Sequence, residues 1–352
     1  MQRQQQAIEW LKAQFPNNPF TFTPASADAS FRRYFRATFS DGSTKIVMDA
    51  PPQHEDCKPF LHVAKLFADA GTHTPHVYAQ DFKLGFLLLS DLGTTTYLQA
   101  LTADNAPQLY SAATDALIKI QLASRENELP PYDEALLRRE LNLFPDWYIA
   151  KHLGVTLSEK QQAKLEEVFT RIVANNLAQP SVYVHRDYHS RNLMHISAPS
   201  PLMGEGCGEG EEKKREFLNN PGIIDFQDAV YGPITYDLAS LFKDAYIKWE
   251  EAEIMDWLIR YWEKARKAGL PVHADFGEFY RDYEMMGAQR HIKVLGIFAR
   301  LCHRDGKDAY LKDMPLVMSY LHATCVRYID LKPLLNILDE LELNKPEVGY
   351  TF

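Results

Sequence analysis

Two short motifs constrain this sequence more than any other feature. The first is VYVHRDYHSRNLM at residues 182–194, and the second is GIIDFQD at residues 222–228. Each opens with a β-branched or apolar run and then presents polar side chains, Asp187 and Asn192 in the first motif and Asp225 in the second. Phosphoryl transfer from ATP needs a carboxylate that receives a hydroxyl proton, and oxygen ligands for magnesium. The spacing predicts Asp187 as the catalytic proton acceptor, with Asn192 and Asp225 as magnesium ligands.

The order of these two motifs resembles the catalytic loop and metal-binding motif of protein-kinase-like enzymes. The letters HRDYHSRN and IDFQD are more similar to the aminoglycoside phosphotransferase branch, whose members phosphorylate small molecules. The resemblance implies ATP and Mg²⁺ and an α+β fold with two lobes. A small antiparallel-sheet N-lobe would bind the nucleotide with residues 1–92, and a larger, mainly helical C-lobe would span residues 93–352. Two alternatives remain for the letters: a capped strand end, and metal ligation by His185, Asp187 and His189.

The first 92 residues follow the order of a nucleotide-binding lobe. A β-rich segment at 20–23, a small-residue loop at 25–30, the segment FRRYFRATF and an apolar strand at 45–48 succeed one another. Small side chains would let backbone N–H groups of the loop approach phosphate. The ATP contacts predicted here are Ser26, Ala29, Ser30, Arg32, Arg33 and Lys45. Met48 stands where the family resemblance places a lysine, so the phosphate-binding cation stays open among Arg32, Arg33 and Lys45.

The run GFLLLSDLG at residues 85–93 resembles the hinge between the lobes. Backbone groups near Leu89, Ser90 and Asp91 would read the adenine edge there. From residue 94 the apolar spacing predicts helices, among them one at 136–149 and one opened by a capping box at 158–161.

In the small-molecule kinases that this chain resembles, the helical region forms part of the acceptor pocket. The predicted acceptor contacts are His189 of the first motif and, from the helical regions, Arg139, Glu140, Trp147, Arg290 and Arg300. An ion-paired helix surface and a core tryptophan are the alternatives for the residues at 139–147. The resemblance also implies that Asp237 holds the catalytic loop through backbone N–H groups.

Composition narrows the cellular setting and the partners. The net charge of −9 argues against a nucleic-acid-binding surface. Four cysteines without CxxC spacing indicate a reduced, cytoplasmic protein, and no apolar run reaches the length of a membrane span. The polar N-terminus does not read as a signal peptide. Residues 198–220 are rich in Pro, Gly and mixed charge, which predicts a flexible excursion between two strands.

Further segments resemble the anomeric kinases of bacterial cell-wall recycling, namely DASFRRYFR, MDAPP, RELNLFPDWY, GPITYDLASL and GIFARLCHRDGK. This resemblance implies a monomer that phosphorylates the C1 hydroxyl of N-acetylmuramate or N-acetylglucosamine. The lactyl carboxylate of N-acetylmuramate would need a cation, for which Arg300 and Arg290 are the candidates. An aminoglycoside, choline or homoserine kinase remains an alternative, as does a catalytically silent nucleotide-binding protein.

Overall fold

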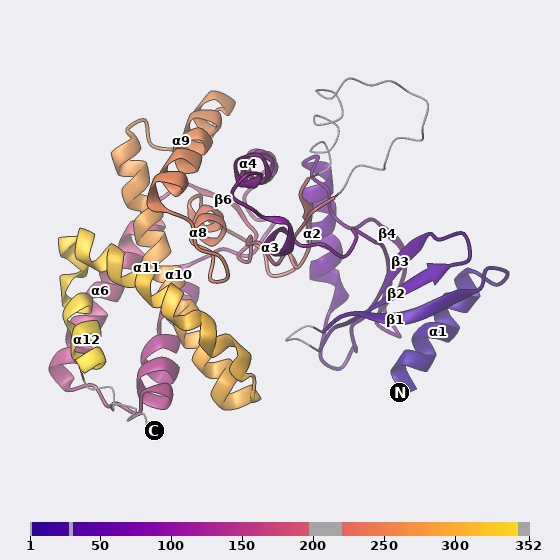
Figure 1. The fold of residues 1–352 in the computed structure, drawn as a ribbon, viewed down its shortest axis with the longest axis horizontal. Coiled ribbons are helices and arrows are strands. Elements are labelled where there is room, and N and C mark those ends of the chain that lie inside the picture. Colours follow the sequence, from indigo (N-terminus) through magenta and orange to yellow (C-terminus); the bar gives the residue numbers. More distant parts are fainter. Residues whose placement is uncertain (1, 28–30, 197–219, 344–352) are drawn as a thin grey trace. The chain divides into compact units, whose positions relative to one another are not determined.

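The computed structural model describes residues 2–27, 31–196 and 220–343 and contains two compact units (Figure 1). The first unit comprises residues 1–120 and 191–228, and the second comprises residues 121–190 and 229–352. The polypeptide therefore enters the second unit after Ile120, returns to the first after Ser190 and leaves it again after Asp228. The predicted lobe boundary at residue 92 does not coincide with these units and stays a prediction. Nearly all of the predicted excursion at 198–220 lies outside the described residues.

A five-stranded antiparallel sheet with the order β1-β2-β3-β5-β4 forms the body of the first unit (Figure 1). Its strands are β1 (Phe20–Ala27), β2 (Arg33–Phe39), β3 (Thr44–Asp49), β4 (Val77–Asp81) and β5 (Phe86–Ser90). In β2, burial alternates along the strand, with Phe35, Ala37 and Phe39 buried, as expected when one face covers a core. The small antiparallel sheet predicted for the N-terminal region is confirmed.

Two helices supply the apolar partners of this unit. Helix α1 (Gln2–Gln14) places Ala7 and Leu11 in one cluster with sheet residues that include Val47 and Phe86. Burying such a face removes apolar area from water, which is the main favourable term in folding. Asp56 caps the N-terminus of helix α2 (Cys57–Asp69), because its carboxylate accepts the Lys58 N–H.

The remaining elements of the first unit are α3 (Tyr97–Ala100), α4 (Ala106–Leu122), which runs two residues past the unit's boundary, β7 (Leu193–Met194) and β8 (Gly222–Ile223). Strands β7 and β8 pair in an antiparallel fashion, with Met194 opposite Gly222. A Cβ atom on Gly222 would lie 3.0 Å from Leu92 and 3.1 Å from Ile196. This close approach favours glycine at residue 222, and the pairing of β7 with β8 joins the two motifs.

The second unit is mainly helical. Its elements are α5 (Glu134–Leu141), η1 (Phe144–His152), α6 (Glu159–Ala178), β6 (Ser181–Val184), β9 (Val230–Pro233), α8 (Tyr236–Phe242), α9 (Glu251–Ala268), α10 (Phe276–Asp305), η2 (Asp308–Asp313), α11 (Met314–Arg327), η3 (Ile329–Leu331) and α12 (Lys332–Leu343). Helix α10 is buried along much of its length and packs against most of the others. At Gly296 an added Cβ would lie 2.5 Å from the backbone of Leu143, the residue before η1, so this segment can approach α10 this closely only at a glycine.

The single helix predicted over residues 136–149 is wrong. The structure has α5 as far as Leu141 and then a π-helix, η1, from Phe144. Pro145 explains the change, because proline has no N–H to continue the α-helical hydrogen-bond ladder toward Leu141. The capping box predicted at Ser158 and Gln161 is confirmed at the start of α6. Among the described helices, none combines the length and apolar character needed to cross a membrane.

Candidate active site

The segment that carries Asp187 follows strand β6 in the second unit. Strand β6 pairs with β9 and delivers the chain to His185 at its end. Asp237, in the first turn of α8, accepts the backbone N–H of His185 at 2.7 Å and that of Arg186 at 3.1 Å. The expected role of Asp237 as the residue that holds this loop is confirmed. Burial raises the pKa of Asp237 to about 7, against the opposing effect of these two donors and of Arg290.

Further hydrogen bonds fix the loop on both sides of Asp187. Arg186 has a φ of +75°, in the left-handed region that a non-glycine residue seldom occupies. The Asp187 N–H donates to His185 Nδ1 at 3.2 Å, and the His189 N–H donates to the Asp187 carbonyl at 3.0 Å. Asp244 accepts the N–H of Ser190 at 2.9 Å. Backbone strain of this kind persists only where the surroundings hold it, which is typical of catalytic segments.

Basic side chains act on the Asp187 carboxylate. Desolvation works to raise the pKa of Asp187, but electrostatic interactions with Lys293 and His189, and smaller ones with His185 and Arg186, outweigh it and lower that pKa. Asp187 is therefore ionised at neutral pH, as a group that accepts a hydroxyl proton must be.

In the first unit, Asn192 and Asp225 lie side by side. Asn192 Nδ2 is 3.4 Å from Asp225 Oδ2, and the Ile224 N–H donates to the Asn192 carbonyl at 3.1 Å. The other oxygen of Asp225 accepts from Gln227 Nε2 at 2.9 Å. Asp225 has a φ of +63°, and the next side chain, Phe226, is fully buried.

Phe226 anchors this motif to helix α2. Its ring lies 4.9 Å from the ring of Phe60 and 5.8 Å from that of Phe67, measured between centroids. Asn192 and Asp225 thus present an amide and a carboxylate together, and these oxygen ligands fit magnesium. In residues 2–27, 31–196 and 220–343 no group of three or more His, Cys, Asp or Glu could hold a metal ion, so metal ligation by His185, Asp187 and His189 gains no support.

The cations predicted to contact ATP have partners within the first unit. Arg33 NH2 lies 2.5 Å from Asp49 Oδ2, and Arg3 pairs with the other oxygen of the same carboxylate. Arg32 Nε lies 3.9 Å from Glu55, and Lys45 Nζ lies 3.5 Å from the ring centre of Tyr78. The identity of the phosphate-binding cation stays a prediction. Ser26 belongs to β1, where its backbone pairs with Tyr34, whereas Ala29 and Ser30 lie outside the described residues.

The predicted hinge residues lie at the end of β5. Leu89 pairs with Ile46, and the Ser90 hydroxyl accepts the His76 N–H at 2.8 Å. The Asp91 carboxylate accepts from Arg36 through two hydrogen bonds of 2.5 and 3.0 Å. This ion pair ties β2 to the end of β5. It joins residues 55 positions apart, so local sequence patterns gave no sign of it.

The predicted acceptor contacts occupy different environments in the second unit. Glu140 and Arg290 are buried, with 4% and 3% of their surfaces exposed. Arg300 and Trp147 are half-buried, and Arg139 is exposed. The buried His189 ring meets the Tyr246 ring edge-on, with centroids 5.4 Å apart. Their contacts with an acceptor stay predictions.

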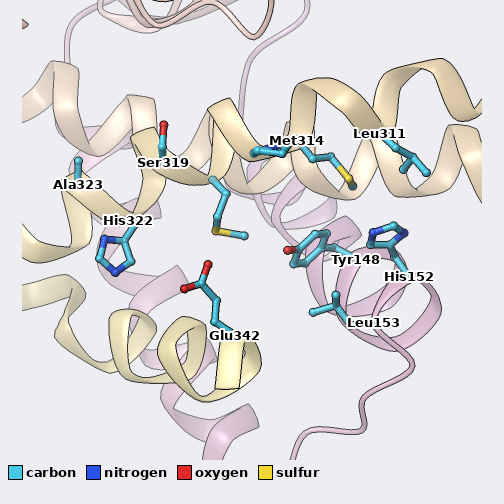
Figure 2. Close-up of a pocket in the computed structure, with 11 residues that line it drawn as sticks. Tyr148, His152, Leu153, Leu311, Met314, Ser319, His322, Ala323 and Glu342 are labelled. Atoms are coloured by element: carbon cyan, nitrogen blue, oxygen red, sulfur yellow. The ribbon is translucent and has the colours of Figure 1, made fainter. Parts of the chain in front are cut away.

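A separate cavity of about 530 Å³ lies among the helices of the second unit (Figure 2). Figure 2 shows Tyr148 and His152 from η1, Met314 from α11 and Glu342 from α12 around it. None of the residues that the sequence predicts as site residues lines this cavity.

Comparison with known families accounts for both motifs. The model of the phosphotransferase enzyme family matches residues 21–204 and 217–276, which include the Asp187 loop and Asp225. The chain belongs to this family. It is therefore an enzyme of a small-molecule kinase family, as its motifs predict.

Three relatives are similar to the chain along almost its whole length, and each is an N-acetylmuramate/N-acetylglucosamine kinase by name. The protein from Neisseria meningitidis is 47% identical and covers 100% of both chains. That from Pseudomonas putida is 46% identical over 97% of each. That from Pseudomonas aeruginosa is 49% identical over 92% of this chain and 89% of its own. The predicted resemblance is confirmed.

Solved structures share the fold at low sequence identity. An ADP-bound aminoglycoside phosphotransferase has a TM-score of 0.56 at 13% identity, covering 90% of this chain and 97% of its own. A Plasmodium vivax ethanolamine kinase has a TM-score of 0.58 at 12% identity, covering 87% and 82%. The protein-kinase-like fold class, with an antiparallel sheet and a mainly helical remainder, is confirmed.

Proposed function

We propose that this enzyme transfers the γ-phosphoryl group of ATP to the anomeric C1 hydroxyl of N-acetylmuramate or N-acetylglucosamine. The observation that carries the proposal is the near full-length similarity to kinases named for these two sugars. The enzyme would act as a cytoplasmic monomer on sugars released in peptidoglycan recycling. The −9 net charge agrees with a small-molecule partner rather than nucleic acid.

Asp187 is the proposed proton acceptor. Its lowered pKa keeps it ionised, and an anomeric hydroxyl is more acidic than an ordinary alcohol, so a carboxylate suffices as base. Asn192 and Asp225 are the proposed magnesium ligands. Magnesium, when bound there, would neutralise charge on the phosphate oxygens. Because little covalent chemistry falls to the protein, its main tasks are to align the acceptor and to exclude competing water.

Arg300 is the proposed partner of the lactyl carboxylate of N-acetylmuramate. Its buried Nε has no hydrogen-bond partner among the residues that the structure describes. Burial, together with the charge of Arg304, lowers the pKa of Arg300, so a guanidinium short of negative charge would gain from an anionic ligand. Arg290 also has a buried nitrogen, Nη1, without a partner among the described residues, but it is the weaker candidate because it is 3% exposed and stabilises the ionised form of Asp237.

The position of Arg300 on α10 agrees with this role. Lys293, Ile297 and Arg300 follow one stripe of the helix at i, i+4 and i+7. Their spacing puts the Arg300 Cα about 10 Å beyond that of Lys293 along the helix axis. Long helical side chains lean toward the N-terminus of their helix, so the Arg300 side chain is expected to extend toward the turns nearer Lys293, whose charge acts on Asp187.

Replacing Arg300 with Gln is expected to lower kcat/KM for N-acetylmuramate by roughly 10- to 100-fold, the loss typical of a charge-assisted hydrogen bond. For N-acetylglucosamine, which has no carboxylate, kcat/KM should stay within about threefold of wild type. Steady-state kinetics with both sugars measure the ratio. Arg281→Gln is the matched control, because Arg281 is an exposed arginine of the same helix and pairs with Asp330. An equal loss for both sugars would refute the assignment of Arg300.

Product analysis tests the reaction itself. Purified enzyme, ATP and Mg²⁺ are incubated separately with N-acetylmuramate, N-acetylglucosamine, kanamycin, choline and homoserine, and ADP release is followed. We expect ADP release with the two amino sugars and a phosphorus NMR signal coupled to the anomeric proton of the product. Phosphate on C6, or turnover with kanamycin, choline or homoserine alone, would overturn the proposal.

A further inference from the structure

A cluster of buried charged side chains in the second unit centres on Glu140 of α5. One carboxylate oxygen of Glu140 lies 2.5 Å from Arg186 NH2 and 3.1 Å from Lys293 Nζ. The other oxygen accepts hydrogen bonds from the Tyr132 hydroxyl and, at 3.1 Å, from Gln289 Nε2. Four donors thus surround a carboxylate that is 4% exposed. This arrangement favours a role for Glu140 inside the protein over the acceptor contact that the sequence predicts.

The first consequence concerns the backbone at Asp187. Arg186 immediately precedes Asp187 and has the strained left-handed φ of +75°. Asp237 holds the Arg186 N–H, and Glu140 holds the guanidinium at the other end of the same residue. Because both the backbone N–H and the guanidinium of Arg186 are held, rotation of the peptide that leads into Asp187 is restricted. Such a second layer of contacts is what keeps a reacting group within a few tenths of an ångström of its working position.

The second consequence concerns the charge beside Asp187. Lys293 is 6% exposed, and its Nζ donates to the Tyr236 hydroxyl at 2.9 Å as well as pairing with Glu140. A buried ammonium persists as a cation only when it is paired and hydrogen-bonded, and both conditions are met here. Glu140 therefore keeps Lys293 charged and in place next to the catalytic loop.

We propose that Glu140 and Lys293 are positioning residues for Asp187. Glu140 fixes Arg186, and with it the backbone that aims the Asp187 carboxylate, while it also holds Lys293 as a cation beside that carboxylate. The inference rests on the proposed role of Asp187 as proton acceptor. Neither residue needs to touch the substrate.

The charge of Lys293 should affect how the activity depends on pH, in a direction that can be predicted. The titratable and charged groups that act on Asp187 are Lys293 from α10, His185, Arg186 and His189 from its own loop, and Asp237 from α8. A positive charge beside a carboxylate lowers its pKa, so removal of the Lys293 charge must raise the pKa of Asp187. Activity that needs ionised Asp187 is then lost at a higher pH on the acid side. This acid limb is the one at lower pH, separate from any step due to Asp237, whose pKa burial raises to about 7.

Lys293→Met removes this charge and leaves Glu140 balanced by Arg186, which favours a folded variant. We expect kcat to fall about tenfold and the acid limb of the kcat/KM profile to move up by about one pH unit. Lys293→Arg, which keeps the charge, should restore the limb to its wild-type position. ATP ionises identically in every assay, so a difference between variants reports on the protein. An unshifted acid limb in Lys293→Met would overturn the electrostatic role.

Lys243→Met is the matched control, because Lys243 is another buried lysine of the same unit, paired with Glu284 at 2.5 Å. It should lower the melting temperature without moving the acid limb, and a shift equal to that of Lys293→Met would contradict the proposal.

Glu140→Gln supplies a second test, which remains usable if the Lys293 variant folds poorly. Its kcat should fall at least tenfold with ATP affinity retained, and unchanged kcat would refute the positioning role of Glu140. If Asp187→Asn keeps near wild-type turnover, the proposed function fails instead, whatever Lys293 does.

Discussion

An Asp187→Asn enzyme is expected to turn over roughly 10³-fold more slowly than wild type, within the range that a positioned base contributes. Asparagine has nearly the same shape as aspartate but cannot accept the hydroxyl proton. The backbone bonds that hold the loop come from Asp237 and Asp244, so they survive the substitution. ATP affinity should therefore stay within about twofold of wild type while kcat collapses. Coupled assay of ADP release gives kcat, and calorimetric titration with ATP gives the affinity.

Asp256→Asn provides the matched loss of one carboxylate in the same unit. Asp256 lies on α9 in an exposed ion pair with Arg260, and pairs of this kind contribute about 0–1 kcal/mol to stability. Its kcat should equal that of wild type. If Asp187→Asn keeps a tenth or more of wild-type kcat, Asp187 is not the proton acceptor.

Local sequence predicts those parts of the site whose residues lie close together in the chain. Asp187 and Asn192 lie five positions apart on one loop, and Asp225 directly follows a short apolar run. The family resemblance implied that Asp237 holds the loop, and the two backbone N–H groups that donate to its carboxylate bear this out. Asp187 and Asp225 each follow a short strand, so adjacent residues predict where these carboxylates lie, while their chemical roles stay predictions.

The contacts that sequence reasoning missed join residues far apart in the chain. Arg36 and Asp91 are 55 positions apart, and Arg186 and Glu140 are 46 apart. Nothing local distinguishes such a residue from one in a solvated helix surface. For the same reason the sequence predicted Arg290 as an acceptor contact without showing that Arg290 and Lys293 are buried. Buried charges of this kind become visible only when their partners are placed in space.

The π-helix η1 shows how a fold detail escapes periodicity. Apolar residues at 136–149 fit an α-helix, and only Pro145 signals an interruption. The π-helix η1 begins directly after Leu143, and the backbone of Leu143 lies close to Gly296 on α10. Tertiary packing therefore decides this element, and π-helical segments recur at functional sites.

Replacing Asp225 with Asn is expected to lower kcat roughly 10²-fold at ordinary Mg²⁺ concentration, the loss typical of removing one group that stabilises transition-state charge. The variant isolates charge, because asparagine tolerates the left-handed φ of +63° at residue 225 as well as aspartate does. Gln227 can still hydrogen-bond the new side chain, and buried Phe226 still anchors the segment through Phe60. Measuring kcat as a function of Mg²⁺ should show half-maximal activity at a concentration at least roughly tenfold higher than in wild type.

Two comparisons decide whether this loss belongs to a metal ligand. Asp41→Asn removes a carboxylate from the exposed β2–β3 turn of the same unit, where Asp41 accepts from Ser43, and it should leave the Mg²⁺ dependence unchanged. ATP binding measured in EDTA should be the same for Asp225→Asn and wild type, because the variant loses affinity only for the metal-bound nucleotide. An Asp225→Asn enzyme whose Mg²⁺ titration matches wild type would show that the carboxylate serves the loop alone, and the magnesium assignment would then have to move away from the IDFQD motif.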